Sequence, residues 1–334
     1  MCGICGIIDY TSTIEAKREA LARMCACLKH RGPDDEGFYV KAEVGLGHRR
    51  LKVIDLSTAG SQPMVSGSGR YVIIFNGEIY NHLKLRQQLP GVSWRGHADT
   101  ETLLAGFEAW GIAETLKKAV GMFAIALWDN QEKVLTLCRD RIGEKPLYYG
   151  FHNNLFIFGS ELKALKAHPE FSGVIDRDVL SLYLKYCYIP APYSIYKGIY
   201  KLSPGSYLQL PVAQGLDNLR SVKPVVYWDL AQVAFRGIAQ PFTGSEQEAV
   251  IALDKQLKQA IDLQMIAGVP LGAFLSGGVD SSTVVALMQA QSSRPVKTFS
   301  IGFNEPGYDE ANYAKAVARH LGTEHTEYYV SSQE

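Results

Sequence analysis

The first six residues, MCGICG, place a thiol at the second position of the chain. Two kinds of chemistry would use a cysteine there: a metal or disulfide element that also involves Cys5, or a nucleophile that works at the chain terminus. If Met1 is removed, Cys2 carries its thiol and a free α-amine on one residue. A thiol with a pKa of about 8.5 could then pass its proton to an amine with a pKa of about 8. The remaining sequence must decide between the two.

A metal site would need further ligands from the other cysteines. Cys25 and Cys27 lie in a segment of helical period, where residues i and i+2 point apart and chelate one ion poorly. A reducing location also disfavours a disulfide framework. We therefore expect no zinc site, and we expect Cys5, Cys25 and Cys27 to be buried structural thiols.

A second motif with chemical potential is LSGGVDSS at residues 275–282. An apolar strand that runs into two glycines and then a helix presents unpaired backbone N–H groups, which suit phosphate. Asp280 would repel a polyphosphate unless a divalent cation bridged them, so the motif implies a nucleotide together with Mg²⁺. The alternative is an ordinary turn in which Asp280 and the serines cap the helix. The phosphate-binding candidates are Ser276, Gly277, Gly278, Asp280, Ser281 and Ser282.

The elements that must position these motifs change character along the chain. Up to about residue 165, short β-rich runs alternate with turn residues, and helices are expected near 15–29, 81–89 and 99–118. This pattern predicts stacked antiparallel sheets with helices outside them. From Glu246 onward, strands and helices alternate, which predicts a parallel sheet with helices on both sides.

Charge and hydropathy exclude several classes of partner. Lysine plus arginine and aspartate plus glutamate both number 34, so no long-range field favours nucleic acid or an anionic membrane. The N-terminus lacks a basic region, and the run AVGMFAIALW is too short to span a bilayer. We expect a cytoplasmic protein whose partners are small molecules; a homodimer is a possible assembly.

Several motifs, in this order, resemble those of the glutamine-hydrolysing asparagine synthases. They are MCGICGI, KHRGPDDEG (29–37), GHRRLKVIDL (47–56), FNGEIYNH (75–82), DTE (99–101), RDRIGEKPLYYG (139–150) and LSGGVDSS. The first half resembles a class II glutamine amidotransferase, an N-terminal nucleophile hydrolase, and the second resembles the opening of an ATP pyrophosphatase domain.

The resemblance implies the fold and its boundaries. We expect an α+β, four-layer αββα sandwich over residues 2–189, a connecting region over 190–245, and an α/β parallel-sheet nucleotide-binding domain over 246–334. The stretch after Ser276 has room for about two βα units, fewer than a doubly wound domain needs. We therefore expect an incomplete second domain and a fragment of a longer synthase.

The resemblance also implies a glutaminase site. Cys2 would attack the side-chain amide of glutamine, and the oxyanion would be held by the side chain of Asn76 and the backbone N–H of Gly77. A hairpin turn is the alternative for FNGEIYN, because Asn-Gly favours one.

Glutamine itself would be held by charged groups. The resemblance assigns Arg50 to the substrate α-carboxylate, and Glu78 and Asp99 to its α-ammonium. The family commonly has serine or threonine before that aspartate, and Ala98 stands there in this chain. Solvated surface charge is the alternative for Arg50 and Glu78. The backbone of Val53 and Ile54 would line the same pocket.

In the second domain, the resemblance implies adenylation of an aspartate side chain by ATP, followed by displacement of AMP by ammonia. The backbone of Leu275 and Ile301 would contact the adenine, and Asp280 would meet Mg²⁺. Alternatives are a related amidotransferase that amidates a sugar acid or peptide, a glutaminase alone, or a non-catalytic scaffold.

Two further charged stretches are assigned no chemistry. His30, Arg31 and Asp34 are expected to shape a loop near the glutamine pocket, or to form a proline-containing turn. The second stretch is expected to be an ion-pair network made by Arg139, Asp140, Arg141 and Lys145.

Overall fold

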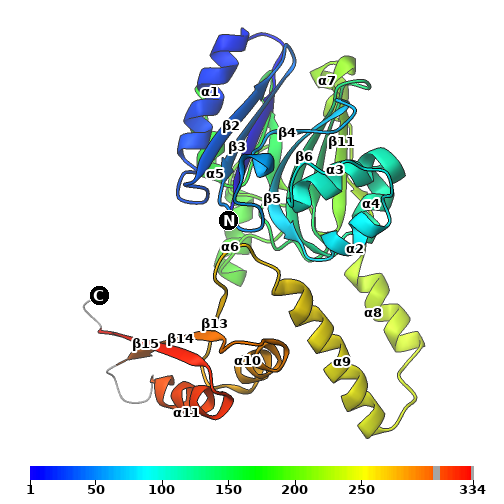
Figure 1. Ribbon diagram of the computed structural model, residues 1–334. Coiled ribbons are helices and arrows are strands. Elements are labelled where there is room, and N and C mark those ends of the chain that lie inside the picture. Colours follow the sequence, from blue (N-terminus) through cyan, green and yellow to red (C-terminus); the bar gives the residue numbers. More distant parts are fainter. Residues whose placement is uncertain (304–308, 332–334) are drawn as a thin grey trace. The chain divides into compact units, whose positions relative to one another are not determined.

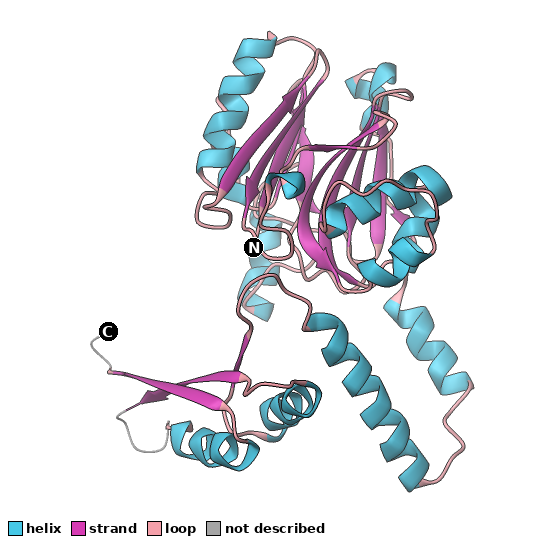
Figure 2. Cartoon of the chain, viewed as in Figure 1, coloured by secondary structure: helices cyan, strands magenta, loops and turns pink. Residues whose placement is uncertain are grey.

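The computed structural model describes residues 1–303 and 309–331. The chain divides into two compact units, Met1–Ala239 and Gln240–Glu334. No described helix is long and apolar enough to cross a membrane. Figures 1 and 2 show the chain by sequence position and by secondary structure.

The first unit contains two antiparallel six-stranded sheets. The first has the order β10 (Ile199–Lys201), β8 (Tyr148–His152), β9 (Leu155–Gly159), β1 (Gly3–Ile8), β3 (Val44–Arg50), β2 (Asp35–Val40). The second has the order β12 (Val225–Val226), β11 (Ser206–Pro211), β7 (Val134–Arg139), β6 (Gly121–Asp129), β5 (Tyr71–Ile79), β4 (Met64–Val65).

These sheets are buried on both faces, because helices cover their outer sides (Figure 2). In β1, Ile4 and Ile8 face the core between the sheets, whereas Cys5 and Ile7 face the outer helices. On the first sheet these helices are α1 (Ile14–Ala26) and α5 (Leu162–Lys166). On the second sheet they are α2 (His82–Gln87), α3 (Asp99–Trp110) and α4 (Ile112–Lys118). The predicted αββα sandwich is confirmed.

The structure corrects three details of this unit. The predicted helix 99–118 is two helices, because Gly111 adopts a positive φ of 78° between them. The FNGEIYN stretch is not a hairpin turn: Asn76 and Gly77 lie inside β5, paired along their length with β6. The expected connecting region contains β10 and β11, which pair with β8 and β7. The region is rich in proline and glycine, which are uncommon inside strands, so the sequence did not predict these two strands.

The remaining elements of the first unit are short. They are the 3₁₀ helices η1 (Thr58–Gly60) and η2 (Val212–Gln214), and the helices α6 (Arg177–Tyr186), α7 (Leu216–Leu219) and α8 (Leu230–Ala239).

The second unit begins with α9 (Glu246–Gln264), whose N-terminus has a capping box between Ser245 and Glu248. A parallel sheet follows, in the order β13 (Gly272–Phe274), β14 (Lys297–Phe303), β15 (Glu324–Val330). Two helices connect these strands: α10 (Val279–Gln291) and α11 (Ala311–Leu321).

The expectation of helices on both sides of this sheet is wrong for the described residues. Successive right-handed crossovers in one direction place α10 and α11 on the same face (Figure 2). The alternating burial of β14 agrees: Thr298 and Ser300 are buried, whereas Phe299 and Ile301 are exposed.

Candidate active site

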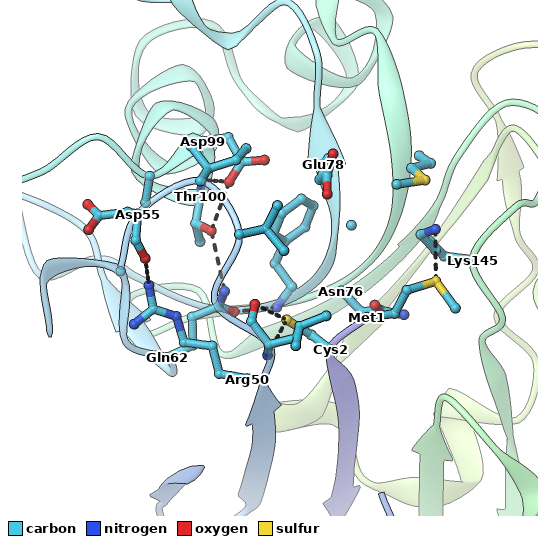
Figure 3. Close-up of a pocket in the computed structure, with 18 residues that line it drawn as sticks. Met1, Cys2, Arg50, Asp55, Gln62, Asn76, Glu78, Asp99, Thr100 and Lys145 are labelled. Atoms are coloured by element: carbon cyan, nitrogen blue, oxygen red, sulfur yellow. Dashed lines mark hydrogen bonds between the residues drawn. The ribbon is translucent and has the colours of Figure 1, made fainter. Parts of the chain in front are cut away.

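A pocket in the first unit gathers residues that are distant in sequence (Figure 3). Its lining residues are Met1, Cys2, Arg50, Leu51, Val53, Ile54, Asp55, Gly60, Gln62, Phe75, Asn76, Gly77, Glu78, Ala98, Asp99, Thr100, Met122 and Lys145. All of the residues that the sequence analysis assigned to glutamine chemistry are among them.

Cys2 lies directly before β1, where that strand runs antiparallel to β3. Gly3 pairs with Arg49, so the chain terminus meets the end of β3. The backbone N–H of Leu51 donates to Cys2 Sγ at 3.4 Å. Burial raises the pKa of the Cys2 thiol, although the Leu51 hydrogen bond and the charge of the terminal amine lower it. The thiol therefore needs a base to react at neutral pH.

Arg31, from the HRGPD stretch, holds the residue that carries this thiol. Its Nε donates to the carbonyl oxygen of Cys2 at 2.9 Å, and its Nη1 pairs with Glu161. Asp34 accepts the N–H of Lys52 at 2.9 Å. The stretch shapes the loops beside the pocket, as expected.

The amide of Asn76 is an unusual buried group. Asn76 is fully buried, and within the described residues neither its Oδ1 nor its Nδ2 has a hydrogen-bond partner. A buried amide without partners costs about 1–3 kcal/mol per group, so the site is built for a polar ligand. At the next residue, a Cβ on Gly77 would lie 2.1 Å from the Met122 carbonyl oxygen, so only glycine permits this strand pairing.

Two carboxyl groups, those of Glu78 and Asp99, face the pocket without an ion-pair partner among the described residues. Asp99 begins α3 and accepts the N–H groups of Ile79 and Thr100, each at 2.8 Å. Burial raises its pKa to about 7, and nearby Glu78 adds to the shift. Burial also raises the pKa of Glu78, against the charges of Lys145 and the terminal amine. A substrate ammonium would satisfy both groups.

At the N-cap of α3, Ala98 makes no side-chain capping bond. Residue 98 is alanine and not the usual serine or threonine, so the backbone N–H of Thr100 at the start of α3 is bonded by the Asp99 carboxylate instead.

Arg50 organises the loop that forms one wall. Its guanidinium donates to the carbonyl oxygens of Ser57, at 2.9 Å, and of Asp55. Arg50 is only 5 % exposed, which excludes the alternative of solvated surface charge. Val53 and Ile54 lie in the loop that it holds.

His48 links the two sheets behind the pocket. Its Nε2 lies 3.1 Å from the carbonyl oxygen of Phe75, so a residue of β3 is bonded to a residue of β5. Burial lowers the pKa of His48 to about 4, so its ring is neutral at pH 7.

The expected ion-pair network at residues 139–145 is wrong. The buried carboxylate of Asp140 accepts backbone N–H groups instead, and Arg139 donates to backbone carbonyls. These bonds are local because the chain turns sharply after β7. The turn places Lys145 in the pocket. The sequence did not predict this position, because nothing in the motif indicates that the lysine is buried.

Cys5 and Cys25 are fully buried, as expected, with their sulfur atoms 3.4 Å apart. The expectation is wrong for Cys27, which is only partly buried because it lies at the C-cap, beyond the last residue of α1. No group of three or more histidine, cysteine, aspartate or glutamate side chains that could hold a metal occurs among the described residues.

The second candidate site lies at the carboxyl end of β13. The loop from Ser276 to Gly278 leads into α10; Gly277 has a φ of 81°, and a Cβ there would lie 2.6 Å from Tyr313. No side chain caps the N-terminus of α10, contrary to the capping alternative. The hydroxyls of Ser276 and Ser281 are 2.9 Å apart.

Four observations bear on a nucleotide ligand here. The Ser282 hydroxyl is buried without a partner in the described part of the chain, and Asp280 is exposed at the helix start. Leu275 and Ile301 line the adjoining cleft. The Leu275 N–H donates to the Phe299 carbonyl at 2.9 Å within the sheet.

Comparisons with known proteins cover both units. Residues 1–220 match the family model described as glutamine amidotransferase domain, and residues 252–334 match that described as asparagine synthase. The chain is similar to a putative glutamine-hydrolysing asparagine synthetase 2 of Methanocaldococcus jannaschii, at 36 % identity over 100 % of this chain and 66 % of the relative. It is also similar to asparagine synthetase 1 of Bacillus subtilis, at 33 % identity over 100 % of this chain and 51 % of that relative.

A solved structure, described as the allosteric regulatory enzyme of purine biosynthesis, shares the fold. Its TM-score is 0.52 at 14 % identity, with 99 % of this chain and 80 % of that chain covered. The chain spans about half to two thirds of the length of the two relatives named above. The motif order, the pocket and both family matches agree, and the chain belongs to the glutamine-hydrolysing asparagine synthetase family, with a glutamine amidotransferase domain in its first unit.

Proposed function

We propose that the first unit hydrolyses glutamine and that the second contributes to the ATP-dependent synthesis of asparagine. The observation that carries the proposal is one pocket that holds the Cys2 thiol, the Asn76 amide and two carboxyl groups, of which the amide has no hydrogen-bond partner and the carboxyls no ion-pair partner among the described residues. A small amino acid with a side-chain amide complements all of these groups.

Glutamine would bind with its charged end away from the thiol. The α-carboxylate would pair with Arg50, whose planar fork suits a carboxylate. The α-ammonium would lie between Glu78 and Asp99, and Val53 and Ile54 would line the side-chain path. This orientation directs the side-chain amide toward Cys2, as the pocket in Figure 3 allows.

The reaction would start after Met1 has been removed. Cys2 Sγ attacks the amide carbon while the thiol proton moves to the α-amine of the same residue. The oxyanion accepts hydrogen bonds from Asn76 Nδ2 and the Gly77 N–H; losing one such donor typically costs about 10²–10³ in rate. The ammonium then returns its proton to the leaving ammonia, and water hydrolyses the thioester to glutamate.

In the second unit, ATP would place its phosphates at the loop of residues 276–278 and the start of α10. The serine hydroxyls and the uncapped helix terminus fit phosphate. Ser276, Gly277, Gly278, Ser281 and Ser282 would hold the phosphates, with Leu275 and Ile301 near the adenine. Mg²⁺ would be held mainly by the phosphates, with Asp280 as a protein ligand.

ATP would activate the side-chain carboxylate of aspartate as an acyl adenylate, and ammonia from the first unit would displace AMP to give asparagine. A cytoplasmic location and a homodimer belong to the same proposal.

The test is glutaminase activity together with the intact mass. We expect the purified protein to lack Met1 and to release glutamate and ammonia from glutamine. Cys2→Ala should abolish the release, whereas Cys27→Ala, which alters a partly buried thiol on another element, should leave it unchanged. Glutamine hydrolysis by Cys2→Ala, or by a protein that retains Met1, would contradict the proposal.

A further inference from the structure

Lys145 is a buried cation of the glutamine pocket. The residue is 5 % exposed, yet its Nζ makes no ion pair with any carboxylate of the described residues. Its hydrogen-bond acceptor is the thioether sulfur of Met1, at 3.1 Å, which is a weak acceptor. Burial lowers the pKa of Lys145, while Glu144, Glu78 and Asp140 raise it. A buried ammonium normally requires a partner, so this placement needs a reason.

The turn before Lys145 holds it in place. Asp140 accepts five backbone N–H groups, those of Phe123, Ile142, Gly143, Glu144 and Lys145, at 2.6–3.2 Å. Arg139 donates to the carbonyl oxygens of Gly143, Lys145 and Leu202, at 2.7–2.8 Å. The N–H and the carbonyl of Lys145 are therefore both bonded to neighbouring charged side chains. Such a fixed backbone directs the ammonium to one place in the pocket.

That place is the chain terminus. Figure 3 shows Lys145 next to Met1, on the side of Cys2 that lies away from Arg50. Arg31 Nε donates to the Cys2 carbonyl oxygen at 2.9 Å, which holds this residue in place, and removal of Met1 moves the α-amine by one residue, to Cys2. Lys145 then loses its thioether contact, and the new amine remains within the field of its charge.

We propose that Lys145 is a positioning residue that keeps the α-amine of Cys2 unprotonated, so that the amine can accept the thiol proton near neutral pH. The inference rests on the proposed glutaminase reaction. A fixed cation destabilises a second cation beside it, and nothing in the reaction neutralises Lys145. The same repulsion makes the protonated amine a better acid toward the leaving ammonia.

Other charged groups around the chain terminus also shift the pKa values of the terminal amine and of the Cys2 thiol. In the chain with Met1, burial lowers the pKa of the terminal amine, Arg31 and Lys145 lower it further, and Cys2 and Glu78 raise it. The thiol also faces Asp99, which raises its pKa, and Arg50, which lowers it. Arg31 is paired with Glu161, so its charge is partly compensated. Of the two cations that lower the pKa of the terminal amine, Lys145 is the one without a carboxylate in ion-pair contact among the described residues.

The first experiment compares pH profiles of kcat for glutamine hydrolysis in the whole chain, because the substrate ammonium pairs with Asp99 in the complex and keeps its titration out of this profile. Lys145→Met keeps the length of the side chain and removes the charge, so the acid limb should move up by about half to one pH unit. Lys145→Arg should restore the original limb. Lys41→Met, at an exposed lysine in the β2–β3 turn, is the matched control and should change nothing.

The second experiment measures the amine without using activity. The rate at which cyanate carbamylates the Cys2 α-amine, followed by peptide mass spectrometry, reports the unprotonated fraction at each pH. Lys145→Met should raise the midpoint by the same amount as the acid limb. Inactive wild-type protein would defeat the proposed function, while this titration would still test Lys145. An unchanged midpoint, or a shift that Lys145→Arg fails to reverse, would overturn the inference.

Discussion

At the scale of single residues, the candidate site consists of groups that are poorly satisfied in the free protein. Asn76 has a buried amide without a hydrogen-bond partner in the described part of the chain, and Asp99 is a buried carboxyl whose pKa is raised to about 7. Folding alone would favour smaller apolar side chains at both positions, because burial of such groups is unfavourable. Their presence is explained by a ligand that completes their hydrogen bonds and charges.

The proposed role of Asp99 predicts that glutamine binding depends on pH. Below about pH 7, Asp99 in the free protein binds a proton and can no longer attract the substrate ammonium. The KM for glutamine should therefore rise as the pH falls, by up to about tenfold per unit well below the pKa. Initial rates between about pH 5.5 and 8.5 would measure it. Asp99→Asn should raise KM and remove the dependence; a KM in the wild type that is flat across this range would show that Asp99 stays ionised.

At the scale of elements, the pocket depends on turns whose backbone is hydrogen-bonded by charged side chains of the same segment. Arg50 bonds the carbonyls of Asp55 and Ser57, and Asp140 bonds the backbone of the turn before Lys145. Each turn follows a buried strand, β3 or β7, so the rigid sheets place the turns and the bonds fix their shape. Asn76 and Gly77 need no turn, because β5 itself carries them into the pocket.

A substitution at Gly60 tests whether the position of the Arg50 guanidinium in its loop matters for substrate binding. A Cβ at Gly60 would lie 2.0 Å from Arg50 Nη2, so Gly60→Ala should displace the guanidinium. We expect the KM for glutamine to rise by about tenfold or more. A tenfold rise corresponds to a loss of only about 1.4 kcal/mol of binding free energy, which a displaced guanidinium would readily cause. Gly67→Ala is the control, because a Cβ there meets nothing within 4 Å. Equal KM values in the two variants, with both proteins folded, would mean that Arg50 does not bind the substrate.

At the scale of the whole molecule, the two units differ in how much they bury. The first unit has a core between its sheets and a further core under each helical layer. The core of the second unit consists of Leu275, Val285, Ala314 and Ala318, with a few partly buried neighbours. Its sheet leaves Phe299 and Ile301 exposed on one face. Since apolar burial is the main stabilising term, the second unit should be the less stable.

The two units should therefore unfold separately. All four tryptophans, at positions 94, 110, 128 and 228, lie in the first unit, so tryptophan fluorescence reports that unit alone. In a urea titration, the far-UV circular dichroism should begin to fall at a lower urea concentration than the fluorescence changes. Coincident transitions from the two probes would instead indicate one cooperative unit.

Most helices and strands could be predicted from the sequence, but the residues at which they begin and end could be predicted less well. Strands buried on both faces were recognisable from runs such as YVIIFNG, because apolar character persists along them. The strands β10 and β11 were missed because they are short and lie among prolines and glycines. The break at Gly111 was missed because helical period continues across it. Helices on both sides of the second sheet were wrongly expected, since strand order is not visible in a βαβ pattern.

The sequence by itself determined the chemical inventory: a cysteine able to become a chain terminus, an Asn-Gly-Glu triplet, and a glycine-serine loop between a strand and a helix. These depend on residue type and short spacing, which the chain carries directly. Only the tertiary structure decided that the Asn76 amide has no partner among the described residues, that burial raises the pKa of Asp99 to about 7, and that Lys145 contacts Met1. Burial and electrostatic fields are properties of groups brought together from distant parts of the chain, so no local pattern could contain them.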